Sequence, residues 1–272
     1  MRKPSRRIAL VSLLAALVAT AAVAHDMYLK PTRYFAPENS EVRIRVLNGT
    51  FTKSENSIAR NRVADVSMVT PVRRVALDIT EWTATGDTST FHIHTRGAGT
   101  YVVGASTRPS VIELTGEEFN LYLREDGIPD MLEARRVAGE LDRPARERYS
   151  KHVKALVQVG TARSSHFGTA LGYPAELIPL DNPYGLAAGA SLRVRTLVDG
   201  RPVANQLVVY GGTGANDAAF EPGTVRSSPE GVATIPIASP GIWYVKFIHM
   251  AKVTGDSVTH ESKWASLTFQ IR

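Results

Sequence analysis

The sequence predicts a mostly β protein made of two antiparallel β-sandwiches with a small helical insert between them. Three observations predict this class. Val42, Ile44 and Val46 alternate with polar residues, which is the period of a strand with one buried face. The segment 116–160 changes to helical spacing. From residue 175 onward, about seven short apolar runs separated by turn residues indicate a sandwich of the immunoglobulin-like or transthyretin-like type.

Residues 1–24 have the pattern of a secretory signal peptide. Four basic residues precede an apolar stretch at 8–18, and Ala22 and Ala24 supply the small side chains of a cleavage site. We therefore expect cleavage after Ala24 and export to a bacterial periplasm. The mature chain would begin at His25 and contain no integral membrane segment.

The charge balance and the cysteine count exclude several classes of function. The whole chain has 32 Lys and Arg against 26 Asp and Glu, and removing the four basic residues of the signal peptide leaves 28 against 26. A chain so close to neutral gives no reason to expect a nucleic acid partner. The chain has no Cys, so disulfides, thiolate metal sites and Cys nucleophiles are excluded. Any bound metal must be held by nitrogen and oxygen.

Changes of pattern divide the mature chain into three parts. We expect an N-terminal sandwich at 25–115, a helical insert at 116–160 and a C-terminal sandwich at 161–272. In the last part, the turn residues Asp199 and Gly200 predict a hairpin whose second strand is 202–210.

The insert contains signals for three helices. Thr115 or Gly116 can cap a first helix that Gly127 ends, and a second follows up to Leu141. Pro144 is suited to the first turn of a third helix at 146–159. The apolar residues spaced along this third segment predict that one of its faces contacts the core.

Cleavage after Ala24 would make His25 chemically unusual. Its free α-amine and its imidazole have ordinary pKa values near 7.7–8.0 and 6.5, so both can be neutral donors near pH 7–8. Two nitrogens of one residue can chelate nickel or copper, and Asp26 beside it adds a carboxylate. A third nitrogen from another His would complete a brace around the metal. The alternative is a His that cleavage merely exposes at a free terminus.

Other candidate ligands are few. His92 and His94 are two apart on a predicted strand, so their imidazoles share a face about 6.5–7 Å apart, although a polar outer face would give the same pattern. His249 ends a core-facing row on a later strand and could enter a site or be a buried, hydrogen-bonded His. His260 and Glu261 lie in a predicted loop, where Glu261 could bind a metal or orient a ligand.

Catalytic motifs are absent from the sequence. It has no G-x-S-x-G elbow, no H-E-x-x-H motif and no phosphate-binding Gly-Lys-Ser/Thr loop. The glycine-rich stretch 211–214 follows a strand and does not open a helix, which is typical of a loop. We therefore expect a protein that is not an enzyme.

The mature start, His-Asp-Met-Tyr-Leu-Lys-Pro at 25–31, resembles the opening of exported NikM-like proteins. That family is often labelled a periplasmic component of nickel or cobalt uptake, or simply a domain of unknown function. Further matching segments span most of the mature chain: 48–51, 53–56, 99–101, 119–127, 146–151, 179–184, 241–243, 249–250 and 261–269.

The resemblance implies metal handling. It makes His25 the terminal ligand of a nickel, cobalt or copper ion, with His249 as the first choice of partner and His94 as the second. Asp26 stands second in the mature chain, and no His stands third. This excludes the square-planar amino-terminal motif and leaves a brace as the expected geometry.

Three hypotheses follow. The first is an exported metal-binding or metal-delivery protein, serving an inner-membrane metal transporter. The second is a non-catalytic sandwich that binds a partner or a ligand, as many such folds do. The third is a copper-dependent oxidase, which also uses an amino-terminal His.

Overall fold

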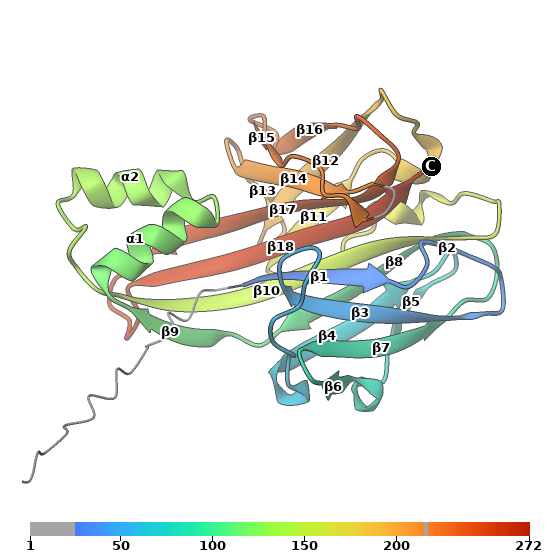
Figure 1. Cartoon of the computed structure of the whole chain (residues 1–272), viewed down its shortest axis with the longest axis horizontal. Helices are drawn as coiled ribbons and strands as arrows, with labels where there is room; N and C mark the ends of the chain where they lie inside the picture. The colour runs from blue at the N-terminus through green and yellow to red at the C-terminus, as the bar shows by residue number, and fades with distance from the viewer. Residues whose placement is uncertain (1–24, 215–216) are drawn as a thin grey trace, which may run out of the picture.

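The structure is a computed structural model, and it describes residues 25–214 and 217–272 (Figure 1). The predicted signal peptide and its cleavage site lie outside the described residues. Among the helices of the described part, none is both long and apolar enough to cross a membrane.

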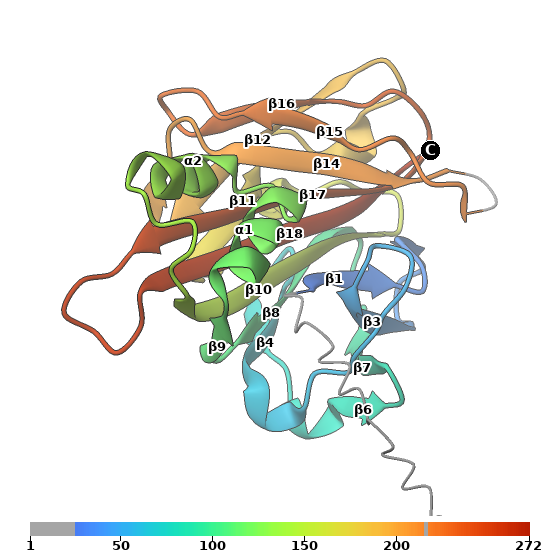
Figure 2. The ribbon, with the colours of Figure 1, turned by 60° about the vertical axis from the view of Figure 1, so that its left-hand side comes forward.

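One large sheet contains strands from both halves of the described chain and is the middle layer of the molecule (Figures 1 and 2). Its strands, in spatial order, are β15 (Gly223–Arg226), β14 (Leu207–Thr213), β17 (Gly241–Lys252), β18 (His260–Ile271), β10 (Ala145–Val159), β8 (Gly99–Thr107), β4 (Val63–Val69) and β5 (Arg74–Ala76). Two short strands, β2 (Phe35–Ala36) and β9 (Ser110–Leu114), also pair with β10.

Two smaller sheets cover the two halves of this central sheet. The first contains β1 (Asp26–Pro31), β3 (Glu41–Gly49), β7 (Thr88–His94) and β6 (Thr83–Thr85); the second contains β11 (Ala175–Pro179), β12 (Ser191–Val198), β13 (Arg201–Pro202) and β16 (Val232–Pro236). Val42, Ile44 and Val46 of β3 are fully buried in the first core, as their alternation predicts. The predicted mostly β, sandwich-like fold is thus confirmed, and the two sandwiches share one sheet.

Two α-helices lie at one end of the molecule (Figure 1). They are α1 (Gly116–Glu125) and α2 (Pro129–Val137), joined by the turn at Gly127. Thr115, one of the two predicted capping residues, caps α1 in a reciprocal capping box with Glu118. Phe119 packs in a cluster with Trp264 of β18, which attaches the helices to the central sheet. The described ranges also contain the short 3₁₀ turns η1 (Arg60–Arg62), η2 (Ile79–Glu81), η3 (Ser165–Gly168) and η4 (Pro183–Gly185).

The predicted helix at 146–159 is wrong, because this segment is the long strand β10. β10 pairs in parallel with β18, Glu147 opposite His260, and both of its faces are covered. A strand buried on both faces loses the alternation that would identify it. The predicted strand at 202–210 is also only partly correct. Just β13 returns beside β12, whereas β14 joins the central sheet.

The face of β10 that is turned towards β11 carries a buried ion pair. Lys154 Nζ lies 2.8 Å from Glu176 Oε2, and the two side chains are 2% and 3% exposed. Burial lowers the pKa of Lys154, and the Glu176 carboxylate opposes that change. Glu176 also accepts hydrogen bonds from three backbone N–H groups, those of Leu171, Gly172 and Tyr173.

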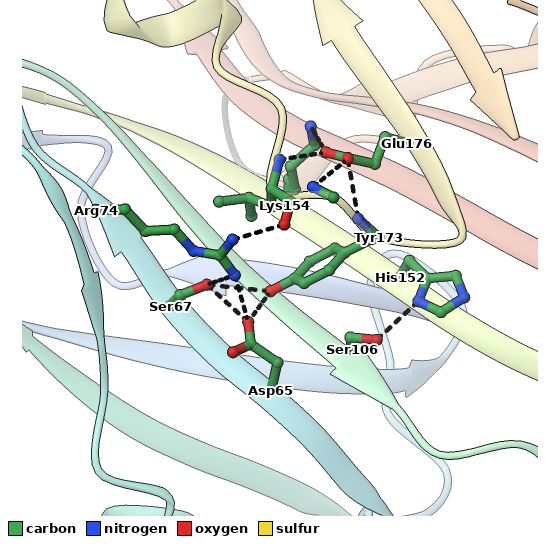
Figure 3. A network of polar contacts seen from close by, with 10 residues as sticks. Asp65, Ser67, Arg74, Ser106, His152, Lys154, Tyr173 and Glu176 are labelled. Atoms are coloured by element: carbon green, nitrogen blue, oxygen red, sulfur yellow. Dashed lines mark hydrogen bonds and ion pairs between the residues drawn. The ribbon is translucent and has the colours of Figure 1, made fainter. Parts of the chain in front are cut away.

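The same loop is tied to the N-terminal half (Figure 3). Tyr173 donates a 2.6 Å hydrogen bond from its hydroxyl to Asp65 of β4, and Arg74 of β5 donates one of 2.7 Å to the Leu171 carbonyl. The polar network therefore joins the loop before β11 to strands of both halves.

We predict that Glu176→Ala lowers the free energy of unfolding by about 3–5 kcal/mol, because it leaves the Lys154 ammonium buried without a counter-charge. Lys154→Met should cost less, since Glu176 keeps its three N–H donors. Urea denaturation of both single variants and of the double variant measures the difference. Equal losses for the two single variants would contradict this account.

A second prediction concerns His152, which is buried on the same face of β10. Its ring nitrogens contact Ser106 and Ser150, and burial lowers its pKa to about 4. As the pH falls below about 6.5, this imidazole binds a proton in the unfolded chain, whereas in the folded chain it stays neutral until the pH approaches 4. The stability from the neutral ring is therefore complete above pH 6.5 and is lost as the pH falls towards 4, by about 3 kcal/mol.

We expect His152→Gln to remove this pH dependence. The free energies of unfolding of the two proteins, measured by denaturation from pH 7 to pH 4, should converge as the pH falls. A constant difference between them across this range would show that His152 does not titrate as described.

Candidate functional site

The structure does not bring together the histidines predicted to share a metal. Asp26 pairs with Gly49 at one end of β3, whereas His94 pairs with Glu41 at the other end. Eight residues of extended chain separate the two positions by about 27 Å. His94 and His92 each lie 3.9 Å from Glu41 and line the outer face of the first sheet.

His249 lies on the other side of the central sheet. Lys246 of β17 contacts Asp26, and successive side chains of a strand alternate between faces, so His249 points away from β1. Its Nδ1 is 3.1 Å from Gln206 Oε1, beside a small cavity of about 200 Å³. It follows a core-facing row, as predicted, but its neighbours belong to the C-terminal half.

His260 and Glu261 begin β18 and do not form a loop. His260 is buried, its Nδ1 is 2.8 Å from Thr259 Oγ1, and its ring lies against Phe119. Burial lowers its pKa to about 4. In the described ranges, no three His, Asp or Glu side chains are arranged to hold a metal ion. The expected three-nitrogen brace is therefore not assembled.

Different residues surround His25, and we call them the amino-terminal cluster: His25, Asp26, Glu55, Lys151 and Lys246. His25 Nε2 lies 3.2 Å from Glu55 Oε2, and the His25 carbonyl accepts a hydrogen bond from Lys151 Nζ. Asp26 Oδ2 lies 2.5 Å from Lys246 Nζ. The cluster draws on β1, β10 and β17 and on the loop after β3.

The loop after β3 places Glu55 beside His25. The chain folds back tightly at Gly49, where an added Cβ would come within 2.6 Å of the Lys53 carbonyl oxygen, so only glycine fits. Ser54 Oγ accepts a hydrogen bond from the Asn48 backbone, and the Glu55 N–H donates to the Asn48 carbonyl. Glu55 is thereby held opposite the first residues of β1.

Lys151 is a buried amine. Its Nζ donates a 2.8 Å hydrogen bond to Asn48 Oδ1, besides its bond to the His25 carbonyl. Burial lowers the pKa of Lys151 to about 8, partly offset by the carboxylates of Asp26 and Asp126. Burial also disfavours the charge of Lys246, but Asp26 and Asp126 outweigh it, so the pKa of Lys246 is raised.

Asp126, at the end of α1, adds a further acid close to the amino-terminal cluster. Burial raises its pKa to about 7, against the pull of Lys246. Its Oδ2 is buried and has no hydrogen bond to another described residue. Tyr28 of β1 donates a 2.9 Å hydrogen bond to Asp26 Oδ2, which fixes that carboxylate from the other side.

The geometry leaves one side of His25 available. Its side chain is 24% exposed, and Nε2 is the ring nitrogen that lies beside the Glu55 carboxylate. Nδ1 is the ring nitrogen that closes a six-membered chelate with the α-amine of the same residue.

Sequence patterns alone do not identify most of this cluster. Lys246 interrupts the apolar run 242–248, and a charged residue within a buried strand is a signal that could have indicated it. Because the sequence predicts a helix at 146–159, it does not show on which face of a strand Lys151 lies. Asn48 and Glu55 gave no signal beyond the turn at Gly49.

Comparisons with solved structures give only remote likenesses. The match to murine CEACAM1b covers 91% of this chain and 99% of that protein, with 9% identity and a TM-score of 0.21. For trypsin-activated alpha-2-macroglobulin from Escherichia coli the shares are 92% and 16%, with 9% identity and a TM-score of 0.22. For a DUF4785 family protein from Legionella pneumophila they are 80% and 50%, with 8% identity and a TM-score of 0.25.

No curated protein matches the chain. The broader part of the resemblance noted in the sequence, to a domain of unknown function, is confirmed, while the NikM-like assignment stays a prediction. The model of the DUF4198 family, described as a domain of unknown function, matches residues 22–251, and the chain therefore belongs to that family.

Proposed function

We propose that the mature protein binds one divalent transition metal ion through the α-amine and Nδ1 of His25. The observation that carries this proposal is the 3.2 Å contact between His25 Nε2 and Glu55 Oε2. Metal-binding histidines commonly donate their other ring N–H to a carboxylate, which fixes the tautomer and the orientation of the ring. The Glu55 carboxylate is placed to accept such a hydrogen bond from Nε2 of His25.

The surroundings of His25 support the same proposal. Its carbonyl is held by Lys151, and Asp26 is held by Lys246 and Tyr28, so the residue is fixed before any metal arrives. A site fixed in advance loses little conformational entropy on binding. His249 and His94 take no part, and water or small anions complete the coordination.

The donor set decides which metals suit the site. Two nitrogen donors of one residue favour copper(II) over nickel(II), and nickel(II) over cobalt(II), following the general order of affinities. Export to the periplasm and delivery to an inner-membrane transporter belong to the same proposal. The free amine exists only after the segment before His25 is removed.

The first prediction for this site concerns the amine. A protein that starts at His25 should bind copper(II) at a ratio of one to one in competition titrations with a coloured chelator. In the same protein with the α-amine of His25 acetylated, the amine is an amide, and binding should weaken by more than about 100-fold, since a direct ligand is lost.

His94→Ala and His249→Ala serve as matched controls, because each removes an imidazole far from the amino-terminal cluster. Both should bind copper(II) as the parent does. Equal affinity for the acetylated protein and the protein with a free α-amine would overturn the proposed function.

The second prediction concerns Glu55. We expect Glu55→Ala to weaken metal binding about 10–100-fold by freeing the His25 ring, without changing the stoichiometry. Glu55→Gln retains an oxygen that can accept a hydrogen bond from Nε2–H, and it should lose less. If both variants bound metal as tightly as the parent, Glu55 would have no part in orienting His25.

A further inference from the structure

An apolar cavity lies in the N-terminal half, at the edge of the central sheet. Its volume is about 590 Å³, within the range of about 300–1,000 Å³ typical of small-molecule sites. Its floor includes Met68 and Tyr101, which belong to the first core. Val75 and Leu77, on and after the edge strand β5, add to the wall. The cavity thus opens directly onto buried apolar side chains.

Hydrogen bonds fix the walls of this cavity. The Tyr101 hydroxyl donates to the Gly97 carbonyl at 2.8 Å and accepts from the Arg96 backbone N–H at 3.2 Å. On the opposite side, Thr70 Oγ1 accepts from the backbone N–H groups of Val72 and Arg73. These bonds fix a turn on which Val72 is 88% exposed. Its apolar side chain therefore lies in solvent beside the opening of the cavity.

The polar lining is cationic. Arg73 and Arg96 line the cavity together with His94, and no Asp or Glu is among its described lining residues. Neither guanidinium makes a hydrogen bond or an ion pair with another described residue, whereas Arg74 nearby bonds the Leu171 carbonyl and Asp65. Glu41, 3.9 Å from His94, is the acid beside this region. Two unpaired guanidinium groups beside an apolar cavity are complementary to an anion with an apolar body.

We propose that this cavity binds the alkyl chain of a medium-chain fatty acid, with its carboxylate at Arg73 and Arg96. The site is distinct from the amino-terminal cluster. His94, which lines the cavity, pairs with Glu41 at one end of β3, whereas Asp26 of the cluster pairs with Gly49 at the other end. It requires neither a metal nor removal of the segment before His25. The two sites can therefore be tested independently.

The test is calorimetric titration of the protein with octanoate, decanoate and decan-1-ol, in the presence of EDTA so that no metal contributes. Decanoate should bind at one to one and about 15-fold more tightly than octanoate, because two more methylene groups are buried. Decan-1-ol should bind more weakly than decanoate, because it lacks the charge that the arginines recognise. Equal binding of octanoate and decanoate, or no saturable binding at millimolar ligand, would overturn the proposal.

Variants separate the two halves of the recognition. Arg73→Gln with Arg96→Gln should weaken decanoate binding at least about tenfold and leave decan-1-ol unchanged. Arg201→Gln, an exposed arginine on β13 of the other half, is the matched control and should change neither ligand.

Val75→Trp should fill the cavity and abolish binding of both ligands, and Leu77→Phe is a milder substitution should the first variant fail to fold. Circular dichroism and the melting temperature establish folding in each case. Retained decanoate binding in a folded Val75→Trp protein would place the ligand elsewhere.

Discussion

The parallel pairing of β10 with β18 is the contact on which the rest of the structure depends. It brings residue 147 beside residue 260 and keeps the two strands together as far as Ala155 and Thr268. Without it, the two halves of the chain would each end in an unpaired edge, which exposes backbone groups to wrong pairing. With it, β10 becomes an interior strand whose two faces serve different halves of the molecule.

This position of β10 explains why buried charges occur where they do. Lys151 points to the side of β1 and binds the His25 carbonyl, whereas Lys154 points to the side of β11 and binds Glu176. Each buried ammonium is compensated from the half that it faces, because an uncompensated one would cost several kcal/mol. The alternation of a single strand thus connects the amino terminus on one face with the loop before β11 on the other.

The sequence predicted those elements whose signal is local. The half-buried strand β3 shows clean alternation at Val42, Ile44 and Val46, and α1 shows its capping residue, so both were correctly predicted. β10 was mistaken for a helix because Tyr149, Val153 and Leu156 have helical spacing, and its partner β18 lies more than a hundred residues away. The same limit applies to the histidines. Spacing of two residues places His92 and His94 on one face, but only the register of β3 decides that this face lies far from His25.

The contacts that hold His25 keep the proposed metal binding separate from folding. Strand β1 is fixed through its backbone pairing with β3 and through Ser266 and Thr268, which donate hydrogen bonds to the carbonyls of Met27 and Leu29. Lys151 binds the carbonyl of His25 rather than its ring. Among the described residues, the polar contact of the imidazole is with Glu55, so replacing the ring should leave the fold intact while removing the proposed ligand. A loss of metal affinity in such a variant then reports on coordination itself, because the position of the terminus is set by main-chain contacts that the substitution does not touch.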